Sequence, residues 1–328
     1  MKKYRVAVLT GGYSPEWEIS LQTGQTIIGH LSQDHFEALE LRILTSGWNV
    51  MFEGEAYPID KRDMSWRDAD GISRHFDLAF MAIHGHPGEN GVLQGYLETL
   101  GIPLAGSGVF SSALSFNKAQ TSAYVKRFGI DVARSVLFRH GNSLNEDEII
   151  AELGLPLFVK PNRSGSSFGI SRVDEKQALA KAVNTALAYD ELVVIEEAII
   201  GTELACGISD HTGQAEVLGI TEIVPKNRFF DYESKYSGES EEITPARIST
   251  EVQKKLESQS LLVYQELELK GIARIDFILS ADGIPYMIEA NSVPGMSSAS
   301  IVPQQIKWKG LALSDIFEKM SRACLPPE

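Results

Sequence analysis

An Asp-Gly pair at residues 282–283 separates two runs of β-favouring residues, ARIDFIL (273–279) and IPYMIEAN (284–291). Asp-Gly between two such runs is the strongest short-range signal for a β-hairpin. If these two residues form the turn, Ala281 pairs with Ile284, and the register of the whole hairpin follows by counting back. The chain is therefore expected to contain a well-defined antiparallel strand pair in this region.

The predicted register sorts the side chains of the hairpin onto two faces, because side chains alternate along a strand with a period of two. One face carries the polar residues Arg274, Asp276, Glu289 and Asn291. The other face carries the apolar residues Ile275, Phe277, Ile288 and Ala290. In this register Asp276 lies opposite Glu289, and Arg274 lies opposite Asn291.

Opposed carboxylates on the polar face repel each other and destabilise the strand pair unless a cation compensates. Arg274 is one candidate for that cation. A divalent metal ion is the other, because carboxylate and amide oxygens are ligands that Mg²⁺ accepts, usually together with substrate phosphates. A solvated charged face on an edge hairpin accounts for the same pattern, and the residues alone leave both interpretations open.

The segment LFVKPNRSGSSFGIS (157–171) ends an apolar run on Lys160 and continues into small polar residues. Closely spaced backbone N–H groups in a Gly/Ser loop bind phosphate or another oxyanion, and Lys160 adds a positive charge. The sequence contains no GxxxxGK[ST] motif and no GxGxxG motif after a strand, so an ordinary P-loop and a Rossmann fingerprint are excluded. A mobile Gly/Ser turn is the alternative interpretation.

The N-terminal part alternates between short apolar strands and helical patterns. RVAVLT (5–10) leads into a glycine pair and a helical pattern over 19–31, and FDLAFMAI (76–83) ends at HGHPGENG (84–91). This alternation predicts a small parallel-sheet α/β unit, whose ligand-binding loops follow the carboxyl ends of its strands. Residues 45–75 are polar and irregular and receive no assignment.

The middle of the chain predicts two strands, PLFVKP and ELVVIEEAI, on either side of an amphipathic helix over residues 174–190. Asp174 is expected to cap this helix, with Gln177 as its capping-box partner three residues later. An acidic, aromatic segment over 229–246 follows and is typical of either a lid or a solvated Ω-loop.

Composition excludes several classes of function. The net charge of −14 argues against a nucleic-acid backbone as the main partner, although locally placed cations can still bind anions. The two cysteines, Cys206 and Cys324, lack metal-type spacing and fit a reducing compartment. The first apolar run is too short for a signal peptide, and no run reaches the roughly 18 apolar residues of a membrane span. The chain is expected to be cytoplasmic, without a membrane partner.

Several polar residues beside the predicted loops are ambiguous when each is considered alone. Lys118 is typical of a solvated surface lysine, and His84 of a loop residue. Glu16 and Glu18 fit negative charges near a helix N-terminus. The order of these residues along the chain carries more information than any one of them.

That order and spacing resemble the D-alanine–D-alanine ligases, a family of ATP-grasp enzymes of peptidoglycan synthesis. The resemblance covers most of the chain and excludes the 45–75 region and the last dozen residues. The matching segments are GGYSPEWEIS, IHGHPGENGVLQGYLE, GSGVFSSALSFNK, FVKPNRSGSSFGIS, VIEEAIIGTEL, FFDYESKY, ARIDFIL and IEANSVPGMSSAS.

The resemblance implies an α/β and α+β fold with the three-domain ATP-grasp architecture. An N-terminal parallel-sheet (pre-ATP-grasp) domain over residues 1–117 helps to bind the first D-alanine. A central domain over 118–202 and a C-terminal domain over 203–328 hold ATP between their two sheets. The C-terminal domain carries the lid loop and the metal-binding hairpin.

The resemblance also implies a reaction. The carboxylate of one D-alanine attacks the γ-phosphate of ATP and gives an acyl phosphate, from which the amine of a second D-alanine displaces phosphate. The protein mainly positions the reactants and stabilises charge. The implied partners are therefore the small molecules D-alanine and ATP.

On the phosphate side of the implied site, two lysines match those that contact the α- and β-phosphates, Lys118 and Lys160. The loop over 164–169, which includes Ser167, matches the loop that closes over the phosphates. Lys235 matches a lysine that reaches the γ-phosphate when the lid closes.

The rest of the implied nucleotide site involves Glu196 and Glu203, which match positions that contact adenine and ribose. Two positions depart from the family pattern, Glu197 where lysine is common and Ala299 where histidine is common. These departures affect contacts with the adenine edge and the second substrate rather than the reaction. The hairpin residues match ligands of two Mg²⁺ ions, with Mn²⁺ as an alternative metal: Asp276, Glu289 and Asn291.

On the side of the first substrate, Glu16 matches the acid that faces the ammonium group of D-alanine. Ser166 matches a serine that works with Tyr236 and Glu16 to hold the substrate and anchor the lid. His84 matches a histidine near the carboxylate of the first D-alanine.

On the side of the second substrate, Arg274 and the backbone N–H of Gly295 match groups that stabilise the tetrahedral oxyanion. Ser300 matches the group that binds the carboxylate of the second D-alanine. Tyr236 goes with an amino acid as the second substrate in this family, which favours a dipeptide product.

Two alternatives remain open. One is the same fold with D-serine or D-lactate as second substrate, and Tyr236 argues against D-lactate. The other is a nucleotide-binding regulator without turnover, which has no need of Arg274. The family is often dimeric, which leaves a homodimer open, and the sequence identifies no interface.

Overall fold

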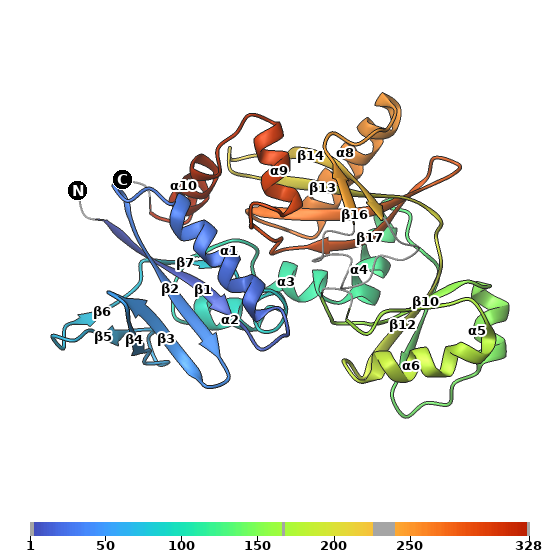
Figure 1. Ribbon diagram of the computed structural model, residues 1–328, viewed down its shortest axis with the longest axis horizontal. Coiled ribbons are helices and arrows are strands. Elements are labelled where there is room, and N and C mark those ends of the chain that lie inside the picture. The colour runs from blue at the N-terminus through green and yellow to red at the C-terminus, as the bar shows by residue number, and fades with distance from the viewer. Residues whose placement is uncertain (1–2, 166–167, 226–239, 327–328) are drawn as a thin grey trace.

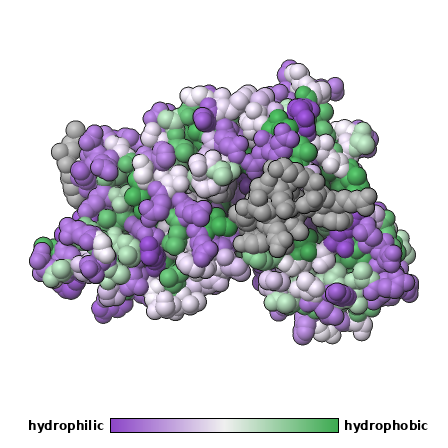
Figure 2. Space-filling model, in the orientation of Figure 1, coloured by the Kyte–Doolittle hydropathy of each residue, from purple (hydrophilic) through white to green (hydrophobic). Residues whose placement is uncertain are grey.

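Three sheets follow one another along the chain in the computed structural model, which describes residues 3–165, 168–225 and 240–326. Figure 1 shows the first sheet at the left end of the molecule, the second sheet at the lower right and the third sheet above and between them. Hydrophilic side chains cover most of the face seen in Figure 2, and hydrophobic ones form small separate groups. Within the described ranges, no helix is long and apolar enough to cross a membrane.

The first sheet has six strands in the order β4-β3-β2-β1-β7-β8. The strands are β1 (Tyr4–Gly11), β2 (Phe36–Leu44), β3 (Gly47–Phe52), β4 (Glu55–Pro58), β7 (Leu78–Met81) and β8 (Leu104–Ala105). The run β2-β1-β7-β8 is parallel, so the predicted parallel-sheet unit is confirmed.

The unassigned region 45–75 supplies an antiparallel edge to this sheet through β3 and β4, followed by a small separate pair, β5 (Trp66–Arg67) and β6 (Ser73–Arg74). Only Val50 of β3 is buried, and none of β4 is. Edge strands with so little burial lack the alternating apolar pattern that reveals a strand.

Both faces of the parallel part are covered, as parallel sheets require. Val6 and Val8 pack with α1 (Trp17–His30) and with Phe317 of α10 (Leu313–Ala323), while Ala7 and Leu9 pack on the other side with α2 (Val92–Thr99). Figure 1 shows α10, near the C-terminus, beside α1. The last helix therefore returns to the first sheet, and the predicted division at 118 and 203 stays a prediction.

The second sheet is antiparallel, with the order β11-β10-β12-β9. Alternation along β10 sends Leu157 and Val159 into a core with the helices and leaves Phe158 and Lys160 on the opposite face. The elements are α4 (Lys118–Val125), β9 (Ser135–Arg139), α5 (Glu146–Leu153), β10 (Leu157–Pro161), β11 (Ser171–Val173), α6 (Leu179–Leu187) and β12 (Leu192–Glu197), with short 3₁₀ turns at Lys126–Phe128 and Lys176–Ala178.

The predicted cap of the helix in this unit is wrong. The α-helix begins at Leu179 after a 3₁₀ turn, and the carboxylate of Asp174 accepts a hydrogen bond from Arg172 instead. Since the arginine lies two residues before it on β11, a charge-assisted bond competes with the cap.

The third sheet is antiparallel, with the order β15-β14-β13-β16-β17. One face packs on α8 through buried residues such as Cys206, Ile275 and Phe277. The elements are β13 (Gly201–Ser209), β14 (Glu216–Pro225), β15 (Ser240–Ile243), α8 (Thr250–Glu266), β16 (Ile272–Ser280), β17 (Pro285–Asn291) and α9 (Ile301–Trp308); α3 (Val109–Ser115) precedes the second sheet.

The packing of α1 on β1 gives a stability prediction at Gly24. A Cβ atom there would lie 2.2 Å from Cγ2 of buried Thr10, whereas a Cβ at exposed Gly29 of the same helix meets nothing within 4 Å. Gly24→Ala is expected to lower the free energy of unfolding by about 1–3 kcal/mol through overpacking. Gly29→Ala is expected to raise it by up to about 1 kcal/mol. Thermal unfolding of both variants checks this, and equal shifts would contradict the close approach of α1 to β1.

Candidate active site

A cavity of about 960 Å³ lies between the second and third sheets and extends to the loops after β1 and β7. Its volume is in the upper range for a small-molecule site. All the predicted site residues that the structure describes line this cavity: Glu16, His84, Lys118, Lys160, Glu196, Glu203, Arg274, Asp276, Glu289, Asn291, Gly295 and Ser300. The other four, Ser166, Ser167, Lys235 and Tyr236, lie outside the described residues.

The predicted register of the hairpin is confirmed at the cavity. Arg274 pairs with Asn291 and Asp276 pairs with Glu289. The predicted turn is wrong, because Ser280 rather than Ala281 bonds Ile284 across it. The three-residue turn shifts the register by one, and a bulge after Asp276 shifts it back.

The same bulge corrects the predicted apolar face. Met287 pairs with Phe277 and enters the core, whereas Ile288 is the extra residue and lines the cavity beside Glu289. The hairpin therefore offers an apolar side chain next to its charged group, which suits a ligand with both kinds of surface.

The polar face of the hairpin is an ordered charge network. Arg274 Nε and Nη2 each donate to a carboxylate oxygen of Asp276 at 2.7 Å, and Asn291 Nδ2 donates to Asp276 Oδ2 at 3.1 Å. Burial alone would lower the pKa of Arg274, but the attraction of Asp276 outweighs it and raises that pKa. The guanidinium thus stays charged inside the cavity wall.

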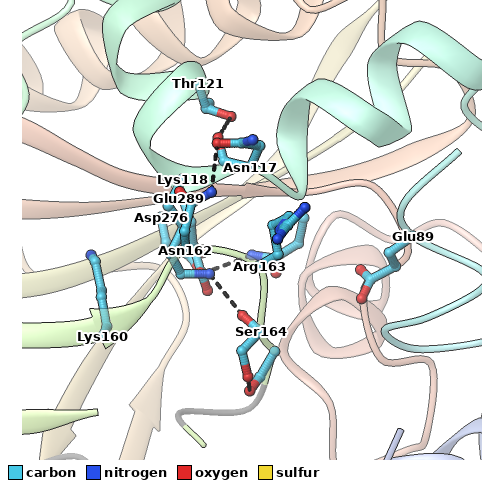
Figure 3. Close-up of polar contacts among 12 residues, drawn as sticks. Glu89, Asn117, Lys118, Thr121, Lys160, Asn162, Arg163, Ser164, Asp276 and Glu289 are labelled. Atoms are coloured by element: carbon cyan, nitrogen blue, oxygen red, sulfur yellow. Dashed lines mark hydrogen bonds and ion pairs between the residues drawn. The ribbon is translucent and has the colours of Figure 1, made fainter. Parts of the chain in front are cut away.

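Lys118 joins this network from α4. Its ammonium lies 3.2 Å from Glu289 Oε2 and donates to the carbonyl of Ser164 at 2.8 Å. Figure 3 shows Lys118, Glu289 and Asp276 gathered together, with Lys160 apart from them on a strand of the second sheet. On that strand the ammonium of Lys160, only 5% exposed, donates to Glu196.

Two asparagines that the sequence reasoning missed hold Lys118 in place. Asn117 caps α4 by accepting from the Gln120 N–H, and its Oδ1 also accepts from Asn162 Nδ2 at 2.9 Å. Asn162 accepts from the Ala119 N–H in return. These contacts join the start of α4 to the end of β10, and Figure 3 shows the two asparagines. The only signal in the sequence was that Asn117 directly precedes Lys118 and that Asn162 lies two residues after Lys160.

The hairpin oxygens fit a divalent cation by their chemistry. Asp276, Glu289 and Asn291 are two carboxylates and an amide on one face of adjacent strands, the donor type that Mg²⁺ accepts. No group of three or more His, Cys, Asp or Glu suited to a metal occurs among the described residues, and the set on the hairpin has two carboxylates and one amide.

His84 lies in the cavity wall as a neutral imidazole. Burial lowers its pKa to about 4. Its Nε2 lies 3.0 Å from Thr23 Oγ1, and the ring also bonds the main chain of Val293. His84 therefore acts as a hydrogen-bonding group that ties α1 to the loop before α9, not as a source of positive charge.

Glu16 connects the first sheet to the Gly/Ser loop. It is 7% exposed, and a Cβ atom at Gly165 would lie 2.5 Å from its Oε2. The carboxylate thus lies against the backbone of that loop, at the place where the sequence predicts contact with Ser166. A side chain at 165 would displace the carboxylate of Glu16 from this position.

The loop before α9 brings a third set of groups to the cavity. Ser300 precedes the first turn of α9, and its hydroxyl lies 2.9 Å from that of Ser297. A Cβ at Gly295 would lie 2.9 Å from Ser300 Oγ. A side chain at 295 would therefore displace the Ser300 hydroxyl from its present position.

The departure at Glu197 has a structural explanation. Its carboxylate accepts from the Arg134 side chain and N–H at 2.7 and 2.8 Å, so it fastens β12 to the chain before β9. Glu197 does not line the cavity, whereas Ala299 does.

Glu89 is a cavity acid that the sequence reasoning missed. Its Oε2 accepts from the Gly85 N–H at 2.7 Å, and Figure 3 shows it on the far side of the site from Lys160. Burial, with the negative charge of Glu16 as a second cause, raises the pKa of Glu89 to about 8. The signal in the sequence that could have identified Glu89 was the single acidic residue of the segment HGHPGENG.

This shift predicts a pH dependence of stability. The unfolded chain releases the proton of Glu89 near pH 4.5, whereas the folded protein keeps it to about pH 8. Its stabilising contribution is therefore full below the unfolded pKa and is lost as pH rises through about 8. Glu89→Gln keeps the neutral form, so the difference in melting temperature, variant minus parent, is expected to rise on going from mildly acidic to alkaline pH. Parallel curves would contradict the raised pKa.

Family models cover nearly the whole chain. The model of the D-ala D-ala ligase N-terminus matches residues 5–107, and that of the D-ala D-ala ligase C-terminus matches residues 124–321. The chain is 47% identical over 313 residues to the D-alanine–D-alanine ligase of Flavobacterium psychrophilum, covering 95% of each.

Solved structures have the same fold. The VanG D-Ala:D-Ser ligase from Enterococcus faecalis superposes with a TM-score of 0.86 at 31% identity, covering 99% of this chain and 100% of that chain. The D-alanine–D-alanine ligase from Bacillus anthracis complexed with ATP gives 0.77 at 28% identity, covering 97% and 96%. The predicted resemblance and fold class are thereby confirmed.

Proposed function

The chain belongs to the D-alanine–D-alanine ligase family, and from that premise we propose that it joins two D-alanines to D-alanyl-D-alanine with ATP. The supporting observation is the charge network of Lys118, Glu289, Asp276 and Arg274 on the floor of the cavity between the two sheets. The two cations of this network, Lys118 and Arg274, compensate the charge of a ligand that carries several negative charges.

ATP occupies the space between the second and third sheets. Lys118 and Lys160 release their present partners, Glu289 and Glu196, and contact the phosphates. Each lysine keeps a carboxylate beside it in the free protein, which lowers the cost of holding a cation in a partly buried site. Glu203 lies on the face of β13 that lines the cavity and contacts the ribose.

The hairpin holds Mg²⁺ through Asp276, Glu289 and Asn291. When bound there, Mg²⁺ neutralises the charge of the phosphates and lowers the barrier to their attack by a carboxylate. In the free protein these two carboxylates are paired with Arg274 and Lys118, so they already lie on the cavity face before the metal binds.

The two amino acids bind on the side of the cavity that faces the first sheet. Glu16 faces the ammonium of the first D-alanine, and neutral His84 lies near its carboxylate. Attack of that carboxylate on the γ-phosphate forms an acyl phosphate and breaks the bond to the β-phosphate oxygen, so that ADP leaves. Arg274 and the Gly295 N–H stabilise the oxyanion that forms when the second amine attacks it. Ser300 binds the carboxylate of that second substrate.

A D-alanine–D-serine ligase is the second candidate, because the VanG enzyme is among the structural neighbours. The regulator alternative is disfavoured, because the partly buried Arg274, held by Asp276 in the lining of a substrate-sized cavity, is the kind of group that ligation uses at the oxyanion.

The experiment is phosphate release from ATP and Mg²⁺, with D-alanine alone and with D-alanine plus D-serine or D-lactate, followed by mass spectrometry of the product. We expect D-alanine-dependent release and D-alanyl-D-alanine as the main product. Bound ATP without release would contradict ligation, and a mixed dipeptide as the main product would favour the second candidate.

We also propose that the enzyme works in the cytoplasm, where its ATP is available and its two free cysteines, Cys206 and Cys324, stay reduced. A homodimer is consistent with the family but has no interface assigned in this chain.

A further inference from the structure

Glu242 lines the cavity on the strand β15, away from the charge network of the hairpin. It pairs with Ile223 across β14, which pairs in turn with Glu203 on β13. Residues in register on neighbouring antiparallel strands share a face. The side chain of Glu242 therefore projects from the same face of the third sheet that carries Glu203 and Asp276.

The hydrogen-bond partner of Glu242 is a neutral amide. Gln304 Nε2 on α9 donates to Glu242 Oε2 at 2.6 Å and to the carbonyl of Ala299 at 3.1 Å. Among the described residues, no lysine, arginine or histidine forms an ion pair with Glu242; Arg274 acts on it only through a longer-range charge interaction.

The neighbouring cavity acids differ from Glu242 in this respect. Asp276 is paired with Arg274, Glu289 with Lys118, and Glu196 with Lys160. A partly buried carboxylate without an adjacent cation is costly, and burial raises the pKa of Glu242. A cationic ligand group would remove that cost.

The position of Glu242 relative to Ser300 indicates which ligand group this is. One amide, that of Gln304, links Glu242 to the main chain of Ala299, which directly precedes Ser300. An α-amino acid carries its ammonium and carboxylate on the same carbon. An amino acid whose carboxylate lies at Ser300 therefore has its ammonium within a few ångströms of Ser300, in the part of the cavity that Glu242 lines.

We propose that Glu242 binds the ammonium group of the second, acceptor amino acid and selects amino acids over hydroxy acids at that position. This inference rests on the proposed function, in which Ser300 holds the carboxylate of the acceptor. Glu16 and Glu242 then serve the two substrates separately, one ammonium at each end of the cavity.

The selectivity has a physical cause. A hydroxy acid such as D-lactate carries a neutral hydroxyl where the amino acid carries a cation, and it leaves Glu242 without its counter-charge. A site built to pair with one group rejects the analogue that lacks it. Glu242 thus provides a selectivity element within the described residues, separate from the predicted role of Tyr236.

The test is Glu242→Gln, which keeps the size and the contact with Gln304 but removes the charge. In initial rates measured over a range of D-alanine concentrations, we expect the KM of the acceptor site to rise about 10- to 100-fold, the loss of one charge-assisted contact. We expect the ratio of kcat/KM for D-alanine over D-lactate to fall by at least about 10-fold. ATP binding should not change.

Two further variants separate recognition from structure. Glu241→Gln, at the exposed neighbouring position on the same strand, is expected to leave both values unchanged. Gln304→Ala breaks the link to α9 and is expected to weaken both acceptors alike. If Glu242→Gln also lowers both acceptors by the same factor, Glu242 has only a structural role and the proposal is wrong.

The outcomes also separate this inference from the proposed function. If the unmodified protein releases no phosphate with D-alanine, the proposed function fails. If it ligates D-alanine normally and Glu242→Gln leaves acceptor selectivity unchanged, the proposed function stands and only the role of Glu242 is refuted.

Discussion

Replacing Arg274 with methionine is expected to lower kcat by about 10²- to 10³-fold, the effect of losing one oxyanion-stabilising donor. Arg274 is the cation of the buried network on β16, and its fork donates twice to Asp276. Methionine fills a similar volume but offers neither charge nor donors. KM for ATP is expected to change much less, because the oxyanion exists only during the second step.

Arg247→Met is the matched control for this variant. Arg247 also forms a two-point pair, with Glu222 at 2.9 and 2.7 Å, but it does not line the cavity. It is expected to keep full activity. Single-turnover measurements on both variants separate catalysis from binding. A kcat loss below about tenfold for Arg274→Met would contradict its role at the oxyanion.

Glu289→Gln is expected to lower the turnover rate at limiting Mg²⁺ by about 100-fold or more. The variant is expected to stay folded. The carboxylate projects from the cavity face of β17 opposite Asp276 and contacts Lys118. Glutamine keeps the shape of the glutamate side chain but removes the negative charge that a divalent cation requires of its ligand. Raising the concentration of Mg²⁺ is expected to restore part of the rate.

The control for the metal variant is Asp282→Asn at the exposed turn of the same hairpin. It removes the same kind of charge, far from the cavity lining, and is expected to leave the Mg²⁺ dependence unchanged. An unaltered rate of Glu289→Gln at limiting Mg²⁺ would show that the hairpin does not hold the cation.

The hairpin shows both how far sequence reasoning reaches and where it ends. Pairing of Asp276 with Glu289 was predictable from period-two alternation. The turn was not, because Ser280 accepts from the Ile284 N–H and enlarges the turn by one residue. The bulge that restores the register lets Met287 reach the core. Two opposite shifts of one residue cancelled at the cavity, and only the pairs between the turn and the bulge, such as Phe277 with Met287, differ from the prediction.

Other features depended on tertiary contacts that carry no local pattern. The return of α10 to the first sheet, where Phe317 packs on Phe80 at 5.4 Å between ring centroids, could not be expected from the sequence. Similarly, Glu89 and Glu242 are ordinary acids in the sequence. Their significance comes from burial in a shared cavity, which long-range folding alone creates.

The site residues matching the family segments were predictable because those segments are long and keep their order. The residues with which they form ion pairs in the free protein were not predictable. That Lys160 pairs with Glu196, and Lys118 with Glu289, follows from the register between β10 and β12 and from the approach of α4 to the hairpin.

The most direct test of the account is to follow oxygen from D-alanine labelled with ¹⁸O in its carboxylate during turnover with ATP and Mg²⁺. If the carboxylate attacks the γ-phosphate, one labelled oxygen leaves with each phosphate when the second amine displaces it. We predict phosphate carrying one ¹⁸O per D-alanyl-D-alanine formed. Unlabelled phosphate alongside dipeptide would show that no acyl phosphate forms and would contradict the proposed chemistry of this cavity.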